Sequence, residues 1–141
     1  MTYYPPVVAV TLYLSGDMLD PDAVTQATGI APTHSQKKGE AHITCSGKTV
    51  IRKLGVWAWE PGLRGQSVDL QMAALVRCFT SVPVRLRDLP GVEEAYVDLY
   101  SAYAPDGDNA GGEAWTLREP HLQLLAAHGL EFRATISCDS E

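Results

Sequence analysis

The segment from Glu94 to Tyr103 constrains the fold of this chain more strongly than any other part of the sequence. Its small and aliphatic residues alternate with a second series that includes Tyr96, Asp98 and Tyr100. Because successive side chains of a β-strand point to opposite faces of the sheet, this alternation predicts a strand with one apolar and one semi-polar face. We therefore expect a sheet that other elements cover on one side.

Capping residues and apolar spacing predict three helices. Asp20 followed by Pro21 is typical of a helix start, and Ser67 begins the second helix. Thr116 and Glu119 form a capping box for the third. The second helix has an apolar face made of Met72, Leu75, Val76 and Phe79. We place helices at 20–28, 67–82 and 117–128, and strands at 7–14, 41–45, 49–59, 94–103 and 130–138.

This order of elements predicts the fold class. The first six elements follow the β-α-β-β-α-β pattern of a ferredoxin-like core, and one helix and one strand are added after it. The chain has 141 residues, of which 45% are hydrophobic, so it is long enough to bury a core. We expect a single α+β domain over residues 1–141, with a mostly antiparallel sheet that includes the hairpin 41–59 and with helices on one face. Gly55 predicts a bulge or a close backbone contact.

Several short motifs resemble the bacterial domain of unknown function 4279 family. They are Leu19-Asp20-Pro21, Gly29-Ile30-Ala31-Pro32-Thr33, Lys38-Gly39, the tryptophan strand with Trp57 and Trp59, and the closing segment from Leu117 through Leu122 and Leu125 to Gly129-Leu130-Glu131-Phe132. The resemblance covers residues 7–138. It implies a small bacterial cytoplasmic domain, and it implies nothing about catalysis.

The charges are distributed unevenly along the chain. The net charge is −6, with −3 in residues 1–36, +6 in residues 37–87 and −9 in residues 88–141. An acidic chain is a poor ligand for phosphate backbones, so we expect no nucleic-acid partner. The sequence contains no apolar stretch of about 18 residues and no export signal, which favours a cytoplasmic protein without a membrane partner.

Residues that could carry chemistry do not form a known motif. His121 and His128 share a helical face and would need Cys138 as a third zinc ligand, but the usual ligand spacing is absent. Asp106 and Asp108 resemble part of a calcium loop that lacks its closing glutamate. No nucleophile motif or phosphate-binding loop occurs. We expect no catalytic residue, no metal and no cofactor.

The sequence leaves three hypotheses for the function, and the absence of a catalytic motif makes an enzyme the least favoured of them. The first is an interaction protein, of the immunity or antitoxin kind, that binds a protein partner such as a toxin through an acidic face. Its predicted contacts are Tyr96, Asp98, Tyr100, Asp106, Asp108 and Glu113. The alternative is a small-molecule-binding domain with a pocket near the 31–40 loop, lined by Lys37, Lys38 and Trp59. The sequence leaves a homodimer open in either case.

Overall fold

The structure is a computed structural model that describes residues 7–103 and 115–138. It contains two sheets and three α-helices, and a short 3-10 helix, η1 (Leu86–Asp88), follows the second of them. The strands are β1 (Val7–Gly16), β2 (His34–Gln36), β3 (Ala41–Ile43), β4 (Thr49–Ile51), β5 (Gly55–Trp59), β6 (Glu94–Tyr103) and β7 (Glu131–Cys138). The α-helices are α1 (Pro21–Thr28), α2 (Val68–Phe79) and α3 (Glu119–His128). None of these helices has the length and apolar composition needed to cross a bilayer.

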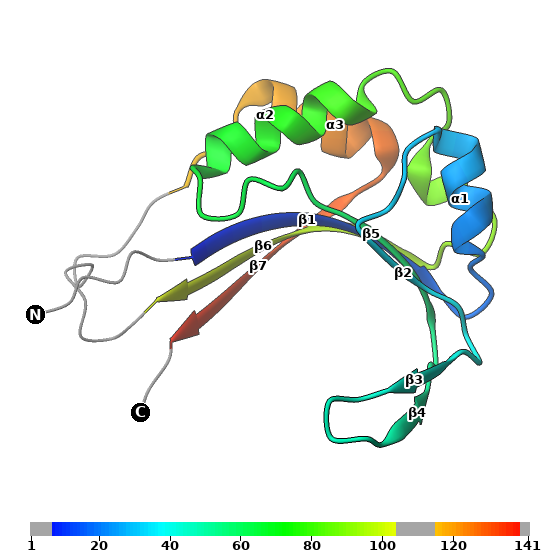
Figure 1. Cartoon of the computed structure of the whole chain (residues 1–141). Helices are drawn as coiled ribbons and strands as arrows, with labels where there is room; N and C mark the ends of the chain where they lie inside the picture. Colours follow the sequence, from blue (N-terminus) through cyan, green and yellow to red (C-terminus); the bar gives the residue numbers. More distant parts are fainter. Residues whose placement is uncertain (1–6, 104–114, 139–141) are drawn as a thin grey trace, which may run out of the picture.

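The main sheet has five strands in the order β2-β5-β1-β6-β7. All neighbouring strands are antiparallel except β6 and β7, which run parallel and are joined through α3. The helices lie on one side of this sheet, and the small hairpin β3–β4 lies on the other side (Figure 1). The expectation of an α+β fold with a mostly antiparallel sheet is therefore confirmed.

The ferredoxin-like core is not confirmed with the strands that the sequence predicts for it. In a split β-α-β unit the two strands on either side of the helix run parallel, with another strand between them. The strand that follows α1 in the main sheet is β2, and β5 lies between β2 and β1 and runs antiparallel to both, with Trp59 opposite Leu12 and Ala58 opposite His34. Residues 41–43 of the predicted strand 41–45 instead pair with β4 in the hairpin, which is inserted between β2 and β5 and lies outside the main sheet.

The predicted hairpin 41–59 is divided between the two sheets. Residues 41–43 pair with 49–51 in a separate two-stranded sheet, whereas 55–59 pair with β1. Gly55 makes the predicted close contact, because a Cβ there would lie 2.5 Å from the carbonyl oxygen of Leu19. The predicted loop 31–40 contains the edge strand β2, which the sequence did not reveal because its residues are all polar.

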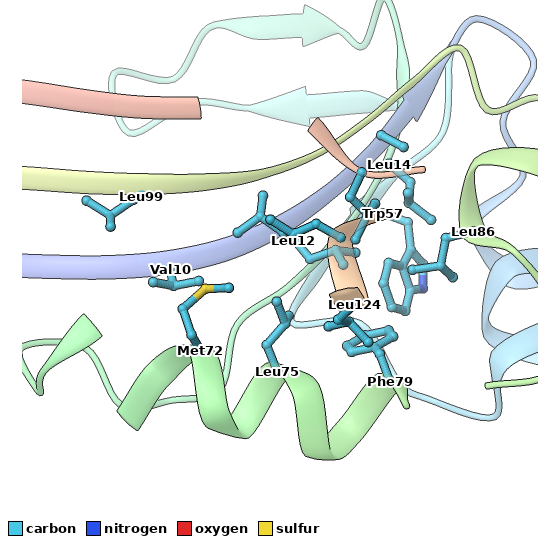
Figure 2. Packing of buried hydrophobic residues seen from close by; sticks show 14 of the residues in the cluster. Val10, Leu12, Leu14, Trp57, Met72, Leu75, Phe79, Leu86, Leu99 and Leu124 are labelled. Atoms are coloured by element: carbon cyan, nitrogen blue, oxygen red, sulfur yellow. The ribbon is translucent and has the colours of Figure 1, made fainter. Parts of the chain in front are cut away.

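The core lies between β1, β5, β6 and the helices. Figure 2 shows the aliphatic side chains of β1 directed toward α2, where Met72, Leu75 and Phe79 are fully buried. Phe79 makes edge-to-face contacts with Trp57 and Trp59, at centroid distances of 6.3 and 5.0 Å. The predicted buried face of the second helix is confirmed, with Val76 only partly buried.

A buried glutamine on α2 completes the hydrogen bonding of β1. β5 ends at Trp59, opposite Leu12, so it leaves the first half of β1 without a partner on that side. The Gln71 amide takes its place: Oε1 accepts from the Val10 N–H at 2.8 Å, and Nε2 donates to the Val8 carbonyl at 2.9 Å. Gln71 is only 1% exposed. The sequence does not predict it as a core residue because its side chain is polar.

The third helix begins later than its sequence signals predict. The structure begins α3 at Glu119, after Arg118, so the predicted capping box of Thr116 and Glu119 is wrong. With Thr116 as the cap, Pro120 would occupy the first position that must donate a helical hydrogen bond, and proline has no N–H. Instead, the His121 Nδ1 accepts from the Arg118 N–H at 3.1 Å.

Candidate partner-binding surface

The face of the main sheet opposite the helices is half-buried on its central strands. We call it the open face. The alternation of β1 and β6 determines its residues, since Leu12 and Val97 are directed to the helices and their neighbours are directed away. On β1, β6 and β7 the open face comprises Thr11, Tyr13, Tyr96, Asp98, Tyr100, Arg133 and Thr135.

A row of stacked side chains crosses the open face. Tyr13 and Tyr96 are opposite each other on neighbouring strands, and their rings are stacked at a centroid distance of 5.3 Å. The Arg133 guanidinium lies 3.9 Å from the centre of the Tyr96 ring and forms an ion pair with Glu94 at 3.3 Å. Burial raises the pKa of the Tyr96 phenol, and Arg133 opposes this shift. At neutral pH the phenol is therefore a neutral hydrogen-bond donor.

The carboxylate of Asp98 lies beside this row. Its Oδ1 accepts a hydrogen bond from the Thr135 hydroxyl at 2.9 Å, which holds the half-buried side chain in one orientation. Tyr96, Asp98 and Tyr100 therefore occupy one face of one strand, as the alternation of the sequence predicts. Their role as partner contacts stays a prediction. The other predicted contacts, Asp106, Asp108 and Glu113, lie outside the described residues.

The hairpin β3–β4 adds a second, chemically different surface on the same side of the sheet as the open face (Figure 1). Its apolar side chains are exposed to solvent, at 70% for Ile43 and 54% for Ile51. Lys48, Arg52 and Lys53 flank them, and no carboxylate of residues 7–103 or 115–138 forms an ion pair with any of these three. The sequence predicted a hairpin, but not its exposure beside the open face.

The residues of the predicted small-molecule pocket are not brought together. Lys37 forms an ion pair with Asp20 at 3.6 Å, and Lys38 forms one with Asp17 at 3.0 Å. Trp59 lies on the helix side of the sheet, where its ring packs against Phe79. Trp59 lies at one end of β5. Lys37 and Lys38 follow β2 at the opposite end of the β2–β5 pairing, where Gln36 is opposite Val56.

The two histidines of α3 have structural roles. His128 is buried, with its Nδ1 accepting from the Leu86 N–H at 3.3 Å and its Nε2 3.1 Å from the Phe79 carbonyl. His121 caps α3, as described above. No three His, Cys, Asp or Glu side chains gather into a metal-binding group within the part of the chain that the structure describes. Burial raises the pKa of the Cys78 thiol, which makes this side chain a poor nucleophile at neutral pH.

Comparison with known proteins identifies the family. No curated protein and no solved structure shows a significant match to the chain. One family model matches residues 2–139, which is nearly the whole sequence, and its description is "Domain of unknown function (DUF4279)". The expected resemblance is thus confirmed, and the chain belongs to the DUF4279 family.

Proposed function

We propose that this protein is a non-enzymatic interaction protein of the immunity or antitoxin kind, and that it binds a protein partner through the open face. The observation that carries the proposal is the half-buried sheet face on which Tyr96 and Tyr100 flank Asp98 and Tyr13 stacks on Tyr96. Tyrosine is enriched at the centres of protein interfaces because one ring offers a large apolar area and a polar tip.

The fixed geometry of these side chains supports the proposal. Tyr96 is held between Tyr13 and Arg133, and Asp98 is held by Thr135. Side chains that are ordered before binding lose less conformational entropy on association, so this surface is preorganised for binding a rigid partner. The phenols would donate hydrogen bonds, and Asp98 would accept from a cationic or amide group of the partner.

The proposal also specifies where the protein acts and what it meets there. We place it in a bacterial cytoplasm, and the exposed free thiol of Cys45 suits such a reducing compartment. A partner seated on the open face would also reach the exposed apolar hairpin beside it. The acidic C-terminal region would accelerate its capture if the partner is basic, as many nucleases are.

Affinity capture from the native bacterium, followed by binding kinetics on the recovered partner, tests the proposal. We expect Tyr96→Ala and Asp98→Asn to accelerate dissociation, because these side chains lie in the centre of the surface. Neutralising Asp106, Asp108 and Glu113 together should instead slow association and reduce its salt dependence.

Leu70→Ser is the matched control, since Leu70 is 54% exposed on α2, in the helix layer. It should bind like the wild type. If the open-face variants and this control bind equally well, the open face is not the interface. Recovery of no protein together with a copurifying metabolite would support the small-molecule alternative instead.

A further inference from the structure

The two edges of the main sheet differ in how they are protected. β2 has only three residues and is followed by Lys37 and Lys38, features by which proteins prevent edge strands from pairing. β7 has eight residues, contains no proline and carries only two charged side chains. Its one neighbour among the described strands is β6. The outward backbone groups of β7 therefore form a row that another strand can pair with.

The helix side of β7 is also incompletely covered. Phe132, Ala134 and Ile136 are directed to this side, since they are opposite Val97, Leu99 and Ser101 of β6. The β6 residues are buried beneath the helices, whereas Phe132 is 36% and Ile136 58% exposed. An apolar stripe thus continues from the core to the edge of the sheet, and the structure covers only its inner part.

We propose that two copies of this chain pair through β7, antiparallel and about a two-fold axis at Ala134. The residues around Ala134 are complementary to themselves in this arrangement. Phe132 is opposite Ile136 of the second copy, and Arg133 is opposite Thr135. The larger apolar side chains of each copy thereby cover those of the other, which is the self-complementarity that a two-fold interface requires.

The pattern of side chains selects this register. A shift by one residue would place the apolar stripe of one copy on the same side as the open face of the other copy, because strand side chains alternate with a period of two. A shift that moves the axis to Arg133 would place two guanidinium groups directly opposite each other, which is unfavourable. A shift that moves it to Thr135 would place Ala134, in place of Phe132, opposite Ile136.

The dimer would join the two five-stranded sheets into one continuous sheet. Because the axis is perpendicular to the sheet, both helix layers would lie on one side and both open faces on the other. The dimer interface would leave Tyr96 and Asp98 accessible. The inference is therefore independent of the proposed function, and its test uses no partner protein.

Light scattering after size exclusion, over a series of protein concentrations, tests whether the dimer forms. We expect a mass of twice 15.3 kDa that falls to 15.3 kDa on dilution. Ile136→Lys should give the single-chain mass at every concentration. Leu70→Lys is the matched control, because Leu70 is 54% exposed on α2 compared with 58% for Ile136, and it should retain the dimer.

Disulfide trapping tests the register. In a background in which Cys45, Cys78 and Cys138 are replaced and the melting temperature is retained, Ala134→Cys should form a cross-linked dimer on oxidation, because residues directly opposite each other are within disulfide reach. Phe132→Cys alone and Ile136→Cys alone should not, whereas an equal mixture of these two variants should cross-link.

A single-chain mass at every concentration would overturn the proposal. A dimer that survives Ile136→Lys, or an Ala134→Cys variant that does not cross-link, would also contradict it.

Discussion

Replacing Gln71 with methionine tests how the backbone hydrogen bonding of β1 is completed. Methionine has nearly the same length and volume as glutamine, so Gln71→Met removes the hydrogen bonds and leaves the packing of α2 nearly unchanged. The buried Val10 N–H would lose the acceptor that now lies 2.8 Å away. The Val8 carbonyl would keep one donor, the Gly65 N–H at 2.9 Å.

The expected loss follows from these contacts. A buried donor without a partner costs about 1–3 kcal/mol, and each hydrogen bond lost from a group that remains satisfied costs about 1 kcal/mol. Apolar burial of the methionine side chain offsets a fraction of this. We expect the free energy of unfolding to fall by about 2–4 kcal/mol, which lowers the melting temperature by about 6–12 °C for a domain of this size.

Urea unfolding monitored by tryptophan fluorescence is the appropriate assay, because Trp57 is fully buried in the core. Gln123→Met is the control, since Gln123 is exposed on α3 and its amide donates to the Glu119 carboxylate on the surface. The control should unfold like the wild type. If Gln71→Met is also within about 0.5 kcal/mol of the wild type, the buried hydrogen bonds do not support β1 as argued.

Three further predictions concern the core and the open face. Leu75→Ala should lower the free energy of unfolding by about 2–5 kcal/mol by creating a cavity under β1, and a wild-type melting curve would contradict this placement. His128→Ala should lower it by about 2–3 kcal/mol, because the buried Leu86 N–H loses its acceptor, whereas the exposed His42→Ala should have no effect; equal urea midpoints would refute this role. In an alkaline ultraviolet titration, Tyr96 should ionise above the ordinary pKa of 10.0, and Tyr96→Phe should abolish that transition. Since the raised pKa means that the folded state holds this proton more tightly, the contribution of Tyr96 to stability is complete below pH 10 and is lost as the pH rises through the folded-state pKa.

Local chemistry made several elements predictable. Asp20 caps α1 through the Asp22 N–H at 3.1 Å, and Ser67 caps α2 through the Leu70 N–H at 3.2 Å, both as the sequence predicts. These caps involve residues two or three positions apart, so the sequence alone contains the whole interaction. The alternation along β6 likewise predicted that Tyr96, Asp98 and Tyr100 share one face.

Elements that depend on distant partners were missed or misplaced. β2 consists of three polar residues whose extended conformation depends on pairing with β5. The start of α3 was misplaced because Thr116 and Glu119 match a capping motif, whereas the missing N–H of Pro120 prevents a helix from starting there. The His121 side chain caps α3 instead, through an interaction that no sequence motif describes.

The sequence by itself determined which segments form helices, where two of them begin and which residues of β6 leave the core, because these properties depend on neighbours within a few positions along the chain. Only the tertiary structure decided the order of the strands, the separation of the hairpin from the main sheet and the exposure of β7 at an edge. Strand pairing joins residues as distant as Val7 and Ala102, and the pattern of apolar residues specifies the face that a strand buries but not the strand beside which it lies.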